Sequence, residues 1–324
     1  MFRHFGRIAL AVGLVLAVPV SAAQAQDYPA RPIRLVVGFT AGGTTDFMAR
    51  MLANRLRGPL GQTVIVENKT GANGSIGAEF VAKSEPDGYT LYFTTAGVAV
   101  VYPHLRPAPY DTLRDFAPVS LVAFNSTMLV VNAAMPVKSA VELAALAREN
   151  PGKITLAITA LGSVSHLGLV LYQSAAGVQF QQVPYRGAAQ AMTDLLGGTL
   201  NGLFGDVPTV IAHIKAGRIK PLAATSKLRS EAFPDVPTFV EQGFADTVAD
   251  QWAGVLAPAK TPPAVIARLN RELNTIVSNA EIKDRFFSQG LEVAGGTPED
   301  YARHLDEELK LNARIVKLAG IKIE

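Results

Sequence analysis

Short runs of β-branched and other apolar residues alternate with longer amphipathic segments along the chain. The apolar run 33–39 precedes a predicted helix over 44–57, and a second run follows at 64–67. This alternation is typical of strands joined by crossover helices, so it predicts an α/β fold with mainly parallel strands flanked by helices. The remaining predicted strands are 90–95, 119–131, 154–159, 180–185, 200–205, 222–226 and 252–257.

Helix-start signals support the same pattern. Ser139 stands three residues before Glu142 as in a capping box, and Thr297 followed by Pro298 opens a helix at the start of a largely helical C-terminal stretch. The length predicts two domains. Because no Gly/Ser linker is visible, ordinary strands are expected to cross between them, near 124–130 and near 250–255.

The first 25 residues have the features of a secretory signal peptide. A basic start is followed by the apolar run 8–18 and by the small-residue pattern Ala23-Gln24-Ala25, which predicts a mature chain beginning at Gln26. A retained anchor is the alternative, but the run is shorter than the roughly 18 residues that a membrane-spanning helix needs. The signal peptide predicts export to the periplasm.

Charge and cysteine content exclude several classes of function. Removing residues 1–25 takes Arg3 and Arg7 from 30 basic residues and nothing from 27 acidic ones, which leaves 28 against 27. Nucleic-acid binding is not expected without a clustered basic face. The chain has no cysteine and its histidines are scattered, so neither disulfides, a metal site nor a cofactor is expected.

The loop 38–46 lies between a predicted buried strand and a predicted helix. Glycines there allow a tight turn, and Thr44, Thr45 or Asp46 is suited to cap the helix, whose free N–H groups attract an anion. Thr44 stands where a phosphate loop has its lysine, which argues against nucleotide binding. The alternative is a capped turn without a ligand.

A second loop of this kind spans 160–167, so the two loops predict a clamp on one carboxylate. Ser163 or Ser165 would cap the following helix, and His166 would either contact the ligand or pack inside. A hydrolase with Ser165, His166 and Asp206 is the competing hypothesis. The expected Gly-x-Ser-x-Gly elbow is absent from the sequence, and neighbouring helical side chains do not face each other.

Other candidates lie where predicted strands end, the edge at which α/β proteins bind ligands. Arg186 and Gly187 follow one strand and Asp206 another; a surface cation and a helix cap are the alternatives. The glycine-rich stretch 71–77 is interpreted as a tight turn with an N-cap at Ser75. Side chains expected near the far end of a ligand are Thr95, Ala96, Asn125 and Ser126.

Ordered motifs over nearly the whole mature chain resemble the substrate-binding receptors of tripartite tricarboxylate transporters, the Bug receptors. The N-terminal part shows Tyr28-Pro-Ala-Arg-Pro-Ile-Arg-Leu-Val-Val37, the Gly42-Gly43-Thr44-Thr45-Asp46 turn and Pro86-Asp87-Gly88-Tyr89-Thr90-Leu91. Val183-Pro184-Tyr185-Arg186-Gly187, Asp194-Leu195-Leu196-Gly197-Gly198 and Val236-Pro237-Thr238 are similar to the second half. In this family, prolines often occupy the places of Gly38 and Ala41, so the first loop is expected to be looser here.

The resemblance implies a two-lobed periplasmic-binding-protein fold, the Venus flytrap, with two crossings. Lobe 1 would comprise 26–125 plus 252–324, and lobe 2 would comprise 126–251. The implied function is capture of a small organic carboxylate, without catalysis, and its delivery to a membrane permease; a sensor role is an alternative. Two pincer loops would hold the carboxylate through backbone N–H groups and ordered waters. Separately from the resemblance, the near-zero net charge and the absence of coiled-coil heptads favour a monomer. The candidate ligand-binding residues are Thr40, Ala41, Gly43, Thr44, Asp46, Thr95, Gly162, Ser163, Ser165, His166, Arg186, Gly187 and Asp206.

Overall fold

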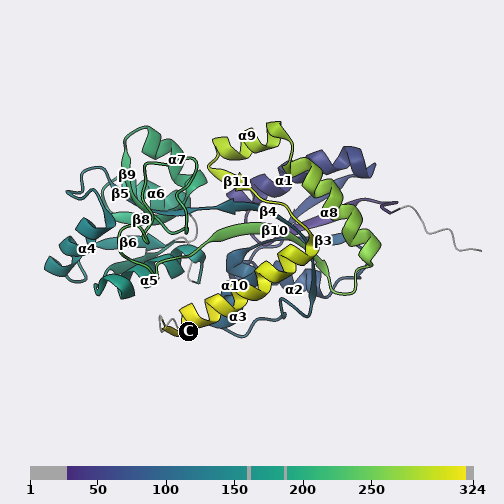
Figure 1. Cartoon of the computed structure of the whole chain (residues 1–324), viewed down its shortest axis with the longest axis horizontal. Coiled ribbons are helices and arrows are strands. Elements are labelled where there is room, and N and C mark those ends of the chain that lie inside the picture. The colour runs from purple at the N-terminus through teal and green to yellow at the C-terminus, as the bar shows by residue number, and fades with distance from the viewer. Residues whose placement is uncertain (1–27, 159–161, 186–187, 319–324) are drawn as a thin grey trace, which may run out of the picture.

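The chain forms two β-sheets, each flanked by helices and joined by strands that pass between them (Figure 1). The computed structural model describes residues 28–158, 162–185 and 188–318. The six-stranded sheet has the order β11-β4-β10-β3-β1-β2, and the five-stranded sheet has the order β7-β6-β8-β5-β9. We call the units around them the first and the second lobe. The predicted two-lobed α/β fold is confirmed.

The strands of the first lobe come from both ends of the chain. They are β1 (Ile33–Val37), β2 (Val64–Asn68), β3 (Thr90–Thr95), β4 (Phe116–Asn125), β10 (Gln251–Pro258) and β11 (Leu291–Val293). The strands of the second lobe are β5 (Thr127–Asn132), β6 (Thr155–Ile158), β7 (Gln181–Pro184), β8 (Gly202–Asp206) and β9 (Ile219–Ala224).

Most strands of each sheet run in one direction, as expected, but both sheets also contain antiparallel pairs. β1 pairs in parallel with β2 and β3, but β10 runs antiparallel to β3 and β4. In the second lobe β6 is parallel to β7 and β8, whereas β5 is antiparallel to β8 and β9. The cause is the crossing itself. β5 enters its sheet from the edge at which the parallel strands end, so it must run the opposite way.

The crossing also divides the long predicted strand 119–131. It forms β4 in one sheet and β5 in the other, separated by Ser126. The carbonyl of Ser126 accepts a hydrogen bond from the N–H of Val207, 3.0 Å away, which ties the crossing to the end of β8. Near-continuous apolar runs lie on both sides of this point, because the strands on both sides are buried.

Side-chain caps mark the starts of some of the helices. Ser139 Oγ accepts from the N–H of Glu142 (3.1 Å), and Thr297 Oγ1 accepts from the N–H of Asp300 (3.1 Å). The described helices are α1 (Thr44–Leu60), α2 (Ser75–Ala82), α3 (Tyr102–Leu105), α4 (Ala140–Glu149), α5 (Val164–Ala176), α6 (Ala188–Leu196), α7 (Val207–Lys215), α8 (Pro263–Val277), α9 (Ala280–Ser288) and α10 (Pro298–Leu318). Short helical turns η1 (Ala72–Gly74) and η2 (Gly97–Val101) precede α2 and α3.

The C-terminal helix α10 contacts both lobes. It runs along the first lobe and ends below α5 of the second (Figure 1). Ile315 and Val316 of α10 share one buried apolar cluster with Val164 and Leu167 of α5. In the part of the chain that the structure describes, no helix is long and apolar enough to cross a membrane.

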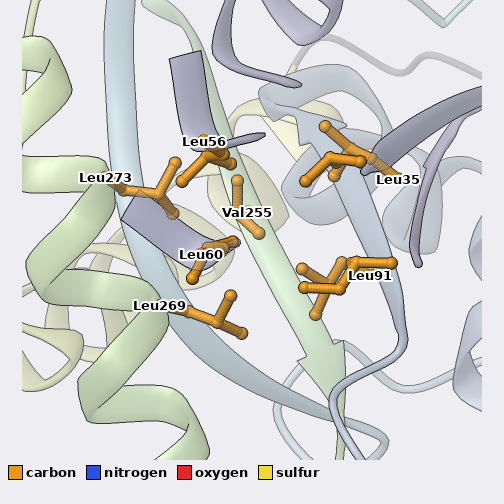
Figure 2. A pocket seen from close by; sticks show the side chains of 9 residues that line it. Leu35, Leu56, Leu60, Leu91, Val255, Leu269 and Leu273 are labelled. Carbon is orange, nitrogen blue, oxygen red and sulfur yellow. The ribbon is translucent and has the colours of Figure 1, made fainter. Parts of the chain in front are cut away.

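The core of the first lobe contains an apolar pocket between the sheet and helices α1 and α8 (Figure 2). Only aliphatic side chains line it, among them Leu35, Leu91, Val255 and Leu273. A carboxylate buried there would lose its hydration without gaining a hydrogen-bond donor from any of these side chains, which is strongly unfavourable. This pocket is therefore a packing feature of the core and not the place for an anionic ligand.

Candidate functional site

The first candidate loop, 38–43, connects β1 to α1. Thr40, Ala41 and Gly43 are exposed, and Gly43 occupies the N-cap position of α1 with an extended backbone (φ −81°, ψ 172°). The first intrahelical hydrogen bond runs from the N–H of Phe47 to the carbonyl of Gly43 (2.9 Å). The N–H groups of the first turn, which precede Phe47, therefore have no partner within the helix and point out of its start. This is the arrangement that the sequence predicted for an anion site.

Asp46 does not sit at the N-cap, where it was one of three expected candidates. It lies in the first turn, and its Oδ2 accepts hydrogen bonds from the N–H of Gly42 (2.9 Å) and from Nε of Arg50 (2.8 Å). Its Oδ1 accepts from Nδ2 of Asn68 (2.9 Å). Burial would raise the pKa of this carboxyl, but the hydrogen bonds from Arg50, Gly42 and Asn68 outweigh burial and hold the pKa below its usual range.

These contacts give Asp46 a positioning role. The buried carboxylate is surrounded by donors from the loop, the helix and the end of β2, so it holds the loop in place. A carboxylate ligand would be repelled by a second carboxylate in direct contact. The exposed backbone of residues 40–44 is the part of the loop that suits an anion.

The second candidate loop leads from β6 into α5, and the structure describes it from Gly162 onward. Ser163 occupies the N-cap, and its Oγ accepts a hydrogen bond from the N–H of His166 (3.3 Å). Ser163 Oγ and Ser165 Oγ lie 2.8 Å apart. Of the two serines considered as caps, Ser163 is the cap, and Ser165 is buried beside it.

His166 is buried and held from both ring nitrogens. Nδ1 accepts a hydrogen bond from the N–H of Gly162 (3.1 Å), and Nε2 lies 3.1 Å from Oε1 of Gln182. Because Nδ1 acts as an acceptor, the hydrogen resides on Nε2 and is donated to Gln182. Burial lowers the pKa of the imidazole, opposed by this hydrogen bond, which favours the neutral form.

The hydrolase arrangement is not formed. His166 directs Nε2 to Gln182, while Oδ1 of Asp206 accepts from the hydroxyl of Thr127 (3.1 Å). A nucleophile would need the imidazole as its base and an acid on the other ring nitrogen. Here the backbone N–H of Gly162 occupies that second position.

Asp206 ends β8 at the junction of the two lobes. It stands at the N-cap position of α7, but in the described structure its side chain makes no cap hydrogen bond, so the interpretation as a helix cap is wrong. Instead the carboxyl faces Thr127 at the start of β5. Burial raises its pKa to about 6, although hydrogen bonds from Thr127 and Asn125 favour the charged form.

Thr95 is buried at the end of β3, next to the loop between β2 and α2. In that loop Gly74, not Ser75, occupies the N-cap of α2, which corrects the sequence-based prediction. Sequence reasoning did not single out Asn73, which has a left-handed backbone (φ 52°) and whose side-chain Nδ2 is buried near Thr95. The Asn-Gly pair at 73–74 was the available signal, since both residues tolerate positive φ.

Two candidate residues, Arg186 and Gly187, lie outside the described residues. Their neighbour Tyr185 donates a hydrogen bond to Asp194 (2.6 Å). Within residues 28–158, 162–185 and 188–318, no group of three His, Asp or Glu side chains is placed to hold a metal ion.

Comparison with known proteins identifies the family and supports the fold. Residues 48–321 match the family model described as the tripartite tricarboxylate transporter family receptor. The chain belongs to this family. It is 39% identical over 311 residues to protein BugT of Bordetella pertussis, covering 95% of this chain and 94% of that protein.

Solved structures support the assignment. The receptor is similar to the periplasmic binding protein BugD (TM-score 0.82, 35% identity, 92% of this chain and 100% of that one). It is also similar to an R. palustris protein with adipate (TM-score 0.85, 34% identity, 91% and 99% covered) and to MatC from Rhodopseudomonas palustris with bound malate (0.81, 27%, 89% and 100%). Members of the family are periplasmic solute-binding proteins, and neither the family nor these neighbours are enzymes.

Proposed function

We propose that this receptor captures a small organic carboxylate between its two lobes and presents it to a tripartite-tricarboxylate-type membrane permease. The observation that carries the proposal is the exposed start of α1. The loop backbone next to Gly43 is fixed there by the hydrogen bond from the N–H of Gly42 to the carboxylate of Asp46. A helix start of this kind attracts an anion through its N–H groups and dipole. Similar proteins with adipate and with malate support the choice of ligand class.

In this proposal the loop 38–43 forms the first jaw of the clamp, and the loop that leads from Gly162 into α5 forms the second jaw. Ser163 and His166 fix the start of α5 from within, since the imidazole accepts the N–H of Gly162 and the Ser163 hydroxyl accepts the N–H of His166. The lobes comprise 26–125 plus 252–324 and 126–251, and they close by hinge motion at the crossings next to Ser126 and Gln251. Residues 1–25 direct export to the periplasm, and the mature receptor acts as a monomer.

Thermal shift of residues 26–324 tests the proposal. The panel comprises mono-, di- and tricarboxylates, with the amide of each acid as its control. A ligand that binds only the folded protein, present at about 100 times its Kd, stabilises it by about 2.7 kcal/mol. A rise in Tm with acids and none with amides is expected. If no acid raises the Tm and mass spectrometry finds no co-purified acid, the proposal is wrong.

A substitution at Gly43 tests the jaw itself. An added Cβ would find Thr40 O as its nearest neighbour at 3.7 Å, and the extended backbone suits valine, so Gly43→Val should fold. Its side chain would cover the helix start and weaken carboxylate binding at least about tenfold, about 1.4 kcal/mol. Gly58→Ala, on α1 with open space around it, is the matched control and should bind normally. Normal binding by Gly43→Val would exclude this loop as a jaw.

A further inference from the structure

The loop between β2 and α2 has an unusual backbone next to the first jaw. Gly71, Ala72, Asn73 and Gly74 all have positive φ (128°, 45°, 52° and 90°). For residues with a side chain this region costs roughly 1–2 kcal/mol, although Asn tolerates it better than most. The surrounding structure therefore has to hold this loop in place.

The side chain of Tyr92 holds this loop in place. The hydroxyl of Tyr92 donates a hydrogen bond to the carbonyl of Gly74 (2.9 Å), and the N–H of Gly74 donates to the carbonyl of Gly71 (2.9 Å). An added Cβ on Gly38 would lie 2.7 Å from Cα of Gly74, so this loop and the first jaw are in close contact. The backbone that carries Asn73 is thus fixed relative to the first jaw.

The side chain of Asn73 presents a donor that the protein leaves unused. Its Nδ2 is buried and, among the residues that the structure describes, has no hydrogen-bond acceptor. A buried donor without a partner costs roughly 1–3 kcal/mol, so such groups are rare unless they serve a purpose.

Gly97 lies next to this donor. A Cβ built on Gly97 would lie 3.9 Å from Nδ2 of Asn73 and 3.9 Å from Oγ1 of Thr95. The φ of Gly97 is outside the left-handed region, so its backbone does not require glycine. What the glycine provides is room between an amide donor and a hydroxyl donor, next to the end of β3.

We propose that Asn73 Nδ2 and Thr95 Oγ1, with the space above Gly97, form a subsite for a second oxygen-bearing group at the far end of the ligand. The inference rests on the proposed function and deepens it. Two neutral donors suit a carboxylate, carbonyl or hydroxyl oxygen and do not suit an alkyl tail, because an alkyl tail would leave the amide unpaired. The preferred ligands are dicarboxylates and hydroxy acids of small size.

The test compares acids that differ only in the far carboxylate. Calorimetric titration is performed with adipate and hexanoate, and with malate and 3-hydroxybutyrate. The wild type should bind each diacid more tightly than its monoacid partner. In Asn73→Gly, which keeps the positive φ and removes the donor, diacid affinity should fall about tenfold or more, and monoacid affinity less than twofold.

Gly97→Ala provides a second, independent variant. Its methyl group occupies the space between the two donors, so it should also weaken the diacids selectively, while Gly58→Ala should change nothing. Melting temperatures of the unbound variants show whether each one is folded.

The outcomes separate the two proposals. Two results would contradict the subsite and leave the carboxylate function standing. In the first, Asn73→Gly binds the diacids as tightly as the wild type does. In the second, its affinity falls equally for the diacid and the monoacid of each pair. If the wild type binds none of the acids, the proposed function fails and the subsite with it. Unchanged diacid affinity in Asn73→Gly is the result expected if Asn73 bonds only to a water molecule and not to the ligand.

Discussion

The side-chain amide of Asn68, the last residue of β2, donates hydrogen bonds to both the carboxylate of Asp46 and the carbonyl of Phe39, each 2.9 Å long. It therefore connects the first turn of α1 to the loop that precedes it. A third partner, the N–H of Gly42, binds the other carboxylate oxygen of Asp46. The shape of the first jaw depends on one buried carboxylate and on a residue 22 positions away.

Asp46→Asn should destabilise the receptor by about 2 kcal/mol at pH 7, because the amide cannot accept all the donors that the carboxylate accepts. The pKa of Asp46 is lowered by those donors, so its stabilising contribution is present above the ordinary carboxyl range and is lost as the pH falls through the lowered pKa. The difference from wild type should thus shrink below about pH 4. Urea unfolding at pH 3.5 and 7 measures it.

The control for that substitution is Glu79→Gln. Glu79 pairs with Lys83 in the same i,i+4 spacing as Asp46 with Arg50, but the pair lies at the surface. Exposed pairs contribute roughly 0.2–1 kcal/mol. An equal loss of stability in both variants would show that the burial of Asp46 adds nothing to the free energy of unfolding.

His166→Asn should make the receptor less sensitive to mild acid. The pKa of His166 is lowered by burial, so its contribution to stability is present above the ordinary histidine value and lost as the pH falls through the lowered one. Protonation would place a hydrogen on Nδ1 and break the bond from Gly162. Asparagine Oδ1 keeps an acceptor there without titrating.

Unfolding free energies at pH 5 and pH 7.5 measure this effect. His213→Asn, at the partly exposed end of α7, is the control. An identical pH dependence of wild type and His166→Asn would mean that the imidazole is not held in its neutral form.

Asp206→Asn should stabilise the receptor at alkaline pH. Burial raises the pKa of Asp206 to about 6, so its favourable contribution is complete below the ordinary carboxyl value and is lost as the pH rises through about 6. Asparagine removes that loss and still offers an oxygen to the Thr127 hydroxyl. We expect a gain of roughly 1–3 kcal/mol at pH 8 and little change at pH 4.

Thermal unfolding across this range tests the prediction, with the exposed Asp235→Asn as control. A variant less stable than wild type at pH 8 would show that the charge of Asp206 supports the junction between the lobes.

Gly38→Ala should destabilise the first jaw, contrary to the expectation that glycine makes it looser. The added Cβ would lie 2.6 Å from the hydroxyl of Tyr92 and 2.7 Å from Cα of Gly74. Overpacking of this kind costs typically 1–3 kcal/mol. Adding Tyr92→Phe should restore only part of the loss, because the Gly74 backbone remains in place and the hydrogen bond from the Tyr92 hydroxyl to Gly74 is lost. If chemical unfolding showed that the double variant is as stable as the wild type, the clash would involve the Tyr92 hydroxyl alone.

The local pattern of the sequence was sufficient for the elements and their starts. The strand predicted at 90–95 matches β3, the helix after Gly43 begins at Thr44, and Ser163 caps α5. Each of these features depends on residues within about four positions of one another, since periodicity, capping and turn preferences are short-range effects.

Other features depended on residues that are distant in the sequence. β11 is three residues long and pairs with β4, more than 160 positions earlier, so nothing local marks it as a strand. A crossing was expected near 124–130, but the break of 119–131 into two strands at Ser126 was not, because burial in either sheet favours the same apolar residues.

For this receptor, the sequence by itself determined the alternating α/β elements, the two glycine-containing loops and their helix starts. Only the tertiary structure decided that Asp46 anchors a loop, that His166 faces Gln182 and that Asp206 faces Thr127. It also brought the donor of Asn73 beside Thr95 and Gly97. A side chain's role depends on which groups surround it, and long-range packing sets those neighbours after the local elements have formed.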